Sequence, residues 1–304
     1  MKPLVVAFGG NALIRAHQLG NFKEQLRNVT LACKEVAALA KEGTPLVIVH
    51  GNGPQVGNLE LQMQAASPRV PTMPLDVEVG MTQGQIGHLI YLGIKKWNQH
   101  AEISTVITHV EVNAKDAGFN HPSKPIGPWY KTAQHLKREH IPFIQDPRKG
   151  FRRVVASPYP QKILEMKTIE ILLEQNQIVI ACGGGGIPVV RKNNAYAGVE
   201  AVIDKDFAAQ LLANQLKSSE LVILTNESYA YLDFGSKKQK ALTHVKVNAV
   251  HDYARKGHFG EGSMLPKVQA SIRFIQKGGK AAYIGKTGEL TQVLTHETGT
   301  RITK

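Results

Sequence analysis

Glycines and charged side chains follow one another closely between residues 177 and 206. Residues 178–182 are apolar and rich in β-branched side chains, which predicts a core strand of a parallel sheet. Glycines occupy positions 183–186 directly after it, and without side chains there a ligand can reach backbone amides. Lys205 then stands between Asp204 and Asp206 at the start of a helical pattern, and either aspartate could cap that helix. A cation opposes the helix dipole at this end, so we predict a bound anion and a phosphate site; a surface lysine in an ordinary cap is the alternative.

A second lysine, Lys267, is expected in the first turn of another helix, with Ser263 as its cap and Pro266 beside it. Two lysines so placed suggest that they share one anion. Phosphoryl transfer requires a protein mainly to align two anions and to neutralise charge on the group that moves. Glycine loops and lysines meet that need, and the sequence shows no Ser-His-Asp or Cys-His arrangement. We therefore favour phosphoryl transfer, with Asp204 and Asp206 as the best-placed acids.

The composition is ordinary for an enzyme except for its charge. The chain has 304 residues, of which 42% are hydrophobic and 20% charged, and its formal net charge is +13. Such a balance suits anionic ligands and would also suit nucleic acid, but the lysines and arginines are spread along the chain rather than clustered. We therefore predict phosphate-bearing ligands and no nucleic-acid partner.

Neither the cysteines nor the histidines have the spacing of metal ligands. Cys33 lies in a predicted helix and Cys182 in a predicted core strand, so both are expected to be reduced packing residues rather than a disulfide. The 12 histidines form no paired motif, and we predict no metal site made by the protein alone. No apolar run approaches the ~20 residues of a membrane span, and the first residues do not resemble a signal peptide. These features predict a cytoplasmic protein with no membrane partner.

A strand, a glycine loop and a helix follow one another three times, at residues 4–11, 47–57 and 178–206. This order is typical of an open, parallel α/β sheet that binds ligands at the carboxyl ends of its strands. The glycine loops match neither common nucleotide signature. The second loop, residues 51–57, has one residue too many for the dinucleotide fingerprint, and Lys280 replaces the glycine that a Walker A loop would need.

The remaining periodicity predicts further elements of this sheet and its helices. Helices are expected over residues 21–42, from Thr82 onward, and from Ser263 onward; strands are expected at 103–110, 221–226, 281–284 and 299–302.

Regular periodicity fails between residues 113 and 157, where glycines and prolines are frequent. So long an irregular segment inside a compact domain is usually functional or a small subdomain. Lys124, Arg152 and Arg153 lie in it, although solvated surface is the alternative for each basic group. No linker divides the chain, so we predict a single domain over residues 1–304 with a protruding subdomain at 113–157.

Taken together and in order, these motifs closely resemble those of carbamate kinases, a branch of the amino-acid kinase fold group. The resemblance covers residues 4–302 and is carried by residues 9–13, 50–57, 82–84, 124–128, 152–155, 183–188, 199–206 and 262–267. It implies a three-layer αβα sandwich with a largely parallel central sheet and a small protruding subdomain, usually as a homodimer. The implied reaction is reversible phosphoryl transfer between ATP plus carbamate and ADP plus carbamoyl phosphate, with Mg²⁺ accompanying the nucleotide.

The resemblance also implies roles for individual residues. Catalytic roles fall to Lys124, Lys205, Lys267 and Asp206, with Lys124 reaching in from the protrusion and Asp206 orienting the other two lysines. Contacts to the carbamate and the moving phosphoryl group are implied for Gly9, Gly10, Asn11, Gly51, Asn52, Gly53 and Arg153. Nucleotide contacts are implied for Gly183, Gly184, Gly185, Asp204, Thr225 and Met264.

Ala7 together with Lys124 favours the carbamate kinase branch, because many other members of the fold group carry a catalytic lysine where Ala7 stands. The sequence departs from the branch's usual pattern at His88, Asn226 and Leu265, and also at residues 284–287. Two alternatives remain: a non-catalytic relative that senses a nucleotide or metabolite, and a kinase for another small carboxylate or carbamate.

Overall fold

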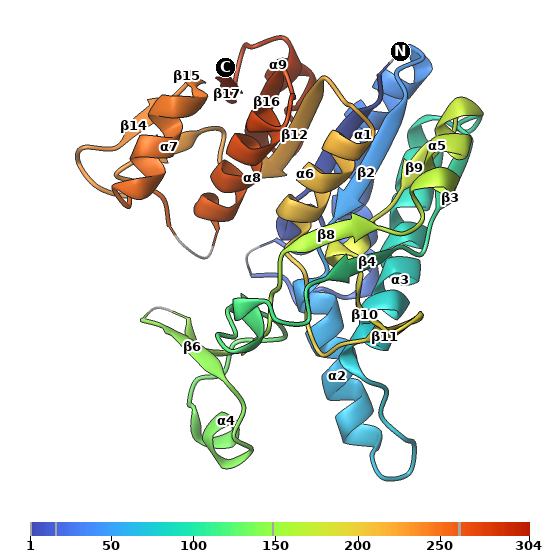
Figure 1. Ribbon diagram of the computed structural model, residues 1–304, viewed down its shortest axis with the longest axis vertical. Coiled ribbons are helices and arrows are strands. Elements are labelled where there is room, and N and C mark those ends of the chain that lie inside the picture. The colour runs from blue at the N-terminus through green and yellow to red at the C-terminus, as the bar shows by residue number, and fades with distance from the viewer. Residues whose placement is uncertain (1, 16, 148, 261–262) are drawn as a thin grey trace.

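A central sheet of eight strands forms the middle of the molecule (Figure 1). The computed structural model describes residues 2–15, 17–147, 149–260 and 263–304, so Gly262 of the motif at 262–267 lies outside the described residues. The strands, in spatial order, are β15 (His244–Lys246), β17 (Thr300–Thr303), β16 (Ala281–Lys286), β12 (Glu220–Thr225), β1 (Leu4–Phe8), β2 (Leu46–His50), β9 (Ile178–Ile180) and β3 (Ile103–Thr105). Neighbours run parallel except β16 and β17, so the largely parallel sheet is confirmed.

Helices cover both faces of this sheet because its strands are apolar on both sides. In β1, Val5 and Ala7 point into one core and Val6 and Phe8 into the other. The first core packs against α5 (Met166–Glu174), α6 (Lys205–Gln215), α7 (Val247–Arg255) and α8 (Met264–Gln276). The second packs against α1 (Phe22–Lys41), α3 (Leu75–Trp97) and α9 (Leu290–Leu294). The predicted three-layer αβα sandwich is thereby confirmed.

Helix α1 shows how local sequence sets an element's limits. Asn21 caps its amino terminus by accepting a hydrogen bond from the Glu24 backbone, and the Glu24 side chain binds the Asn21 backbone in return. Gly43 follows the helix with a φ of 79°, a conformation that favours glycine. The helix predicted over residues 21–42 is therefore confirmed. Cys33 on its inner face is buried and unpaired, as is Cys182, which confirms that both are packing residues.

The strand predicted over residues 103–110 is wrong, because two strands of different sheets replace it. β3 ends at Thr105, and β4 (His109–Val112) begins a second sheet. Between them, the Gln83 side chain accepts from the backbone N–H of Thr108 at 2.8 Å and donates to its carbonyl at 3.1 Å. The Thr108 carbonyl also accepts from the backbone N–H of Ile187 at 2.8 Å, a bond of the second sheet. The backbone of Thr108 is thereby satisfied at the point where the chain leaves the central sheet and enters the second one.

The start of the helix predicted at Thr82 is also wrong. Helix α3 begins at Leu75, and Thr82 and Gln83 lie buried in its interior. Leu75 and Val79, one turn apart, bury their side chains with Val56 of α2 (Gly53–Ala66). This packing extends the helix two turns further toward its amino terminus than predicted.

Two small sheets and a hairpin complete the chain. The second sheet has the order β11 (Ala195–Gly198), β10 (Ile187–Lys192), β4 and β8 (Pro160–Ile163), and the hairpin joins β13 (Ala230–Leu232) to β14 (Lys240–Leu242). The third sheet has the order β5 (Lys124–Pro125), β7 (Gly150–Val155) and β6 (Phe143–Asp146), with α4 (Gln134–Arg138) beside it. Figure 1 shows α4 and β6 standing apart from the central sheet.

Pairing within the third sheet fixes Lys124, because Lys124 lies opposite Val155 in the antiparallel ladder of β5 and β7. Pro125 follows it and limits the backbone further. None of the described helices combines the length and apolar character that a membrane span requires.

Candidate active site

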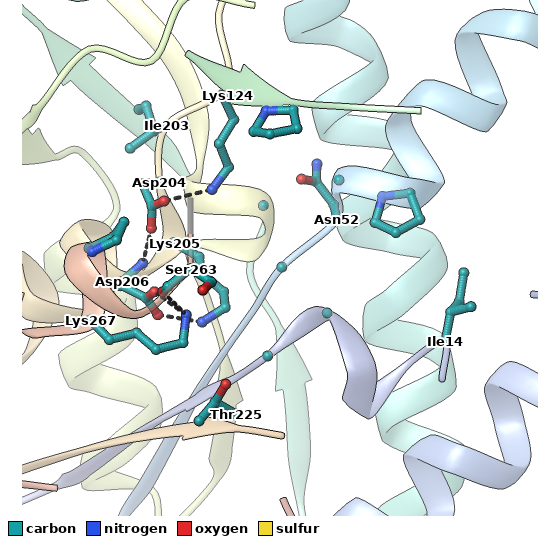
Figure 2. A pocket seen from close by; sticks show the side chains of 18 of the residues that line it. Ile14, Asn52, Lys124, Ile203, Asp204, Lys205, Asp206, Thr225, Ser263 and Lys267 are labelled. Atoms are coloured by element: carbon teal, nitrogen blue, oxygen red, sulfur yellow. Dashed lines mark hydrogen bonds and ion pairs between the residues drawn. The ribbon is translucent and has the colours of Figure 1, made fainter. Parts of the chain in front are cut away.

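A cleft of about 360 Å³ opens at the carboxyl ends of β12, β1, β2 and β9, which are neighbours in the sheet. Figure 2 shows charged side chains from several elements converging in it. Most of the predicted site residues line this cleft: Gly9, Gly10, Gly51, Asn52, Gly53, Lys124, Gly184, Asp204, Lys205, Asp206, Thr225 and Lys267.

Asp206 holds two of the lysines. One of its carboxylate oxygens pairs with the ammonium group of Lys205 and the other accepts from Lys267 Nζ at 3.0 Å (Figure 2). Lys205 and Asp206 belong to the first turn of α6, whereas Lys267 comes from the first turn of α8 and also donates to the carbonyl of Ser263 at 3.0 Å. Asp206 therefore orients both ammonium groups from one buried position.

Burial and charge act against each other on these three groups. Burial lowers the pKa of Lys205, although Asp206 opposes the shift. Burial also disfavours the carboxylate of Asp206, yet the charges and hydrogen bonds of Lys205 and Lys267 hold its pKa well below the usual range. For Lys267, burial is outweighed by Asp206 and Asp204, which raise the pKa. Asp206 is consequently ionised and Lys267 charged at neutral pH.

Lys124 reaches the same cleft from the third sheet. Its Nζ lies 2.6 Å from Asp204 Oδ2, across a separation of 80 residues in the sequence. The other oxygen of Asp204 caps α6 by accepting from the Asp206 backbone at 2.9 Å, as expected for one of the two aspartates. Three ammonium groups thus face two carboxylates, which leaves a net positive charge for an anion.

Two glycines of the loops leave room for neighbouring groups. A Cβ atom at Gly9 would lie 2.8 Å from the carbonyl oxygen of Leu224, and one at Gly51 would lie 3.2 Å from the side chain of Lys205. Any larger residue at either position would displace β12 or Lys205. In contrast, a Cβ at Gly10 would meet nothing within 4 Å, so that side of the cleft is open to a ligand.

The glycines after β9 divide into two kinds. Gly184 lines the cleft with a φ of 64°, and a Cβ there would lie 2.2 Å from the Asn52 amide nitrogen. Gly183 and Gly185 instead leave space for His50 and for the Ile203 backbone, and neither lines the cleft. Glycine at these two positions therefore allows the turn to pack closely against His50 and Ile203.

His50 remains neutral behind this turn. Burial, helped by the positive charge of Lys205, lowers its pKa to about 4, although a hydrogen bond to the carbonyl of Gly51 acts in the other direction. Its Nε2 atom has no hydrogen-bond partner among the described residues. An uncharged ring adds no repulsion to the lysines of the cleft.

Two predicted site residues have other surroundings, and a third is described only in part. Arg153 does not line the cleft, and its guanidinium pairs with Glu60 of α2. Met264 packs against the core at the start of α8 and is also absent from the lining. The backbone of Asn11 forms part of the turn η1 (Gly10–Ala12), while its side chain lies outside the described part of the chain.

Arg152 lines the cleft in place of Arg153, and the sequence reasoning missed it. Its Nε donates to the carbonyl of Gly127 at 2.9 Å, and its guanidinium lies 5.6 Å from the centre of the Trp129 ring. Successive residues of a strand point to opposite sides, so only one of two adjacent arginines can face the cleft. No ligand contact was predicted for the other lining residues, which are Ile14, Pro54, Pro125, Ile203, Asn226, Ser263 and Pro266.

A glycine-lined, cationic cleft at the strand ends of an αβα sandwich is typical of phosphotransferases with the amino-acid kinase fold. The chain belongs to the amino acid kinase family, whose model matches residues 2–286. This result confirms the family resemblance found in the sequence.

Within that family, the chain is similar to several carbamate kinases. The carbamate kinase of Pyrococcus horikoshii is 43% identical, over 99% of this chain and 98% of its own length. That of Latilactobacillus sakei is 40% identical, over 100% of this chain and 99% of its own length. Among solved structures, carbamate kinase from Giardia lamblia bound to AMP-PNP matches with a TM-score of 0.92 and 38% identity, over 100% of this chain and 98% of that one.

Proposed function

We propose that this chain catalyses reversible phosphoryl transfer between ATP plus carbamate and ADP plus carbamoyl phosphate. The observation that carries the proposal is the convergence of Lys124, Lys205 and Lys267 on one cleft lined by backbone glycines. Relatives of about this length that are 40–43% identical are carbamate kinases, which supports the choice of substrate.

The charges suggest how the work is divided. Lys205 and Lys267, held by Asp206, would neutralise the nucleotide phosphates and the phosphoryl group in flight. Lys124 approaches from the opposite wall and would exchange Asp204 for an oxygen of the moving group. Interactions that strengthen as charge spreads over the phosphoryl oxygens lower the barrier of the chemical step.

Backbone groups would hold the substrates between these lysines. We assign the carbamate and phosphoryl contacts to Gly9, Gly10, Asn11, Gly51, Asn52 and Gly53, and add Arg152 to this group. Nucleotide contacts fall to Gly184, Asp204 and Thr225, which line the cleft. Gly183 and Gly185 would act by shaping the turn, Arg153 by holding β7 against α2, and Met264 by seating α8.

Mg²⁺ would enter with the nucleotide, since Mg²⁺ is commonly held by phosphates together with one or two carboxylates. Asp204 and Asp206 are the carboxylates of the cleft, and both are engaged by lysines. In the described ranges, no group of three or more His, Cys, Asp or Glu side chains has a metal-binding arrangement. This lining fits an ion carried largely by phosphate oxygens, where it would neutralise their charge.

We treat residues 1–304 as one catalytic domain in which 113–157 form the protruding subdomain that delivers Lys124. A reaction that uses ATP and ADP fits the cytoplasm, where we propose that the protein acts.

We further propose a homodimer formed through α3. Its exposed residues Val77, Met81, His88 and Tyr91 follow a spacing of three or four (with the open position Gly84 between), so they form one stripe along the helix. The adjacent strand β3 is an edge of the central sheet, which leaves this side of the molecule uncovered. Light scattering should give a dimer mass for the native chain and a monomer mass for Met81→Glu; a monomeric native chain would refute this assembly.

The function is tested by comparing ligand binding with turnover. Calorimetry should show ADP binding, and a coupled assay with Mg²⁺ should show ATP formation from carbamoyl phosphate. Turnover with acetyl phosphate alone would favour a kinase for another small carboxylate. ADP binding without turnover of either substrate would favour a sensor.

A further inference from the structure

A second cavity, of about 440 Å³, lies away from the active-site cleft and shares no lining residue with it. It is bounded by α2, by the start of α3 and by the segment that precedes α6. Its lining consists of Glu60, Gln64, Thr72, Met73, Pro74, Leu75, Glu78 and Glu200. Three carboxylates thus face one cavity in a protein of formal net charge +13.

The three carboxylates differ in how they are satisfied. Glu60 pairs with Arg153, and Glu200 accepts from the Leu75 backbone N–H at 3.1 Å. Glu78 is 2% exposed, and its Oε2 atom has no hydrogen-bond partner among the described residues. Burying a carboxylate oxygen without a hydrogen-bond partner costs free energy, so a ligand that donates a hydrogen bond to this oxygen would be favoured.

The surroundings of Glu78 explain its ionisation. Burial, together with the negative charges of Glu60 and Glu200, raises the pKa of Glu78 to about 7, although the guanidinium of Arg153 acts in the other direction. The carboxyl group is therefore partly protonated at neutral pH, and a cation in the cavity would draw it fully into the ionised form.

The helix dipole does not by itself explain why a glutamate is buried at position 78. An acidic side chain in the first turn of α3 is favoured by the helix dipole, but Asp76 already supplies one and remains partly exposed. Glu78 instead lies beside Leu75 and Val79, which are packed in an apolar cluster where a leucine would cost less.

We propose that this cavity binds a small organic cation, an ammonium or guanidinium group on a short apolar stem, with Glu78 and Glu200 as its acceptors. Met73, Pro74 and Leu75 would contact the stem. A bare metal ion fits less well, because no metal-binding arrangement occurs in the described ranges. The protein already contains one such interaction, because the guanidinium of Arg153 pairs with the Glu60 carboxylate.

Arg153 would compete with such a ligand for the carboxylates. Arg153 adjoins Arg152, which lines the active-site cleft, and both belong to β7, the strand that pairs with the strand of Lys124. The cavity and the active site are thus joined through one ion pair and one strand.

The probe is n-butylguanidinium, with the neutral isostere n-butylurea as its control, and binding to the full chain is measured by calorimetry without nucleotide. We expect a Kd of about 1 mM or tighter for the cation and no binding of the urea. Glu78→Gln, which keeps the shape, should weaken binding about tenfold or more, and the exposed Glu170→Gln should leave it unchanged.

The proposal also predicts the direction of two further changes in binding affinity. Arg153→Met should tighten binding, because it frees Glu60 from its internal cation. Binding should be tighter at pH 8 than at pH 6, since Glu78 has a pKa of about 7 and faces Glu60, Glu200 and Arg153. No binding of the cation by the folded chain, equal binding of the urea, or unchanged affinity in Glu78→Gln would overturn the proposal. None of these outcomes depends on phosphoryl transfer.

Discussion

Replacing Lys124 with methionine separates its role in catalysis from its role in the fold. Methionine keeps much of the stem and removes the ammonium group, which lies 2.6 Å from Asp204 Oδ2. We expect kcat to fall by at least ~10²-fold, because the charge contributes most when the phosphoryl group is in flight.

The structure sets the size of both effects. The side chains of Lys124 and Asp204 are 24% and 15% exposed, so their ion pair is only partly buried, and its loss should lower the free energy of unfolding by about 1–3 kcal/mol. A 10²-fold fall in kcat corresponds to about 2.7 kcal/mol of lost transition-state stabilisation. The variant therefore remains folded while it loses most of its activity.

The assay is the steady-state rate of ATP formation from ADP and carbamoyl phosphate, with urea unfolding measured on the same preparation. Lys131→Met is the matched control, since Lys131 belongs to the same segment and is exposed. The control should retain near-native kcat. If Lys124→Met also retained it, the protrusion would not belong to the active site and the assignment would be refuted.

Other predictions concern the remaining charges of the cleft. Lys267→Met should weaken ADP binding in calorimetry at least tenfold more than Lys124→Met does, because we propose that Lys267 neutralises the nucleotide phosphates; equal effects would contradict this division. Asp206→Asn should lower the free energy of unfolding in urea by about 3–5 kcal/mol, because it leaves Lys205 buried without its partner; a loss below 1 kcal/mol would contradict it. The folded pKa of Asp206 is depressed, so its stabilisation is present above the unfolded value of about 3.9 and is lost as pH falls below it. Below pH ~4, the free energy of unfolding should accordingly fall more steeply with decreasing pH in the native chain than in Asp206→Asn.

The residues at the start of α6 could be predicted because local rules place them. A buried strand, a glycine turn and a capped helix occur in sequence order, and ligands bind such sheets where strands end. Lys205 and its two aspartates therefore had one plausible position, and the structure has them there. Lys267 followed from the same reasoning applied to α8.

Arg152 and Arg153 show what local rules leave undecided. Because side chains alternate along a strand, those of Arg152 and Arg153 must point to opposite sides. Alternation does not determine which of the two faces the cleft, since the cleft is built largely from other segments. That choice depends on Glu60, which lies 93 residues away from Arg153 in the sequence and draws it toward α2. Only the packing of the protrusion on α2 settles it.

Thr108 illustrates a second limit. A run of strand-forming residues predicted one continuous strand, whereas long-range hydrogen bonds from Gln83 divide it between two sheets. Gly183 and Gly185 belong with this case, since the groups that exclude a side chain there, His50 and Ile203, come from other parts of the chain. A glycine run signals close approach of backbone without identifying what approaches.

The most direct test of the account follows the phosphoryl group itself. Native chain is mixed with ADP, Mg²⁺ and carbamoyl phosphate, and ³¹P NMR records the carbamoyl phosphate and ATP γ-phosphate resonances over time. We predict that the first signal falls as the second rises in equal amount, and that Lys205→Met slows this exchange at least ~10²-fold. Loss of carbamoyl phosphate with release of inorganic phosphate alone, or no enzyme-dependent change, would contradict the account.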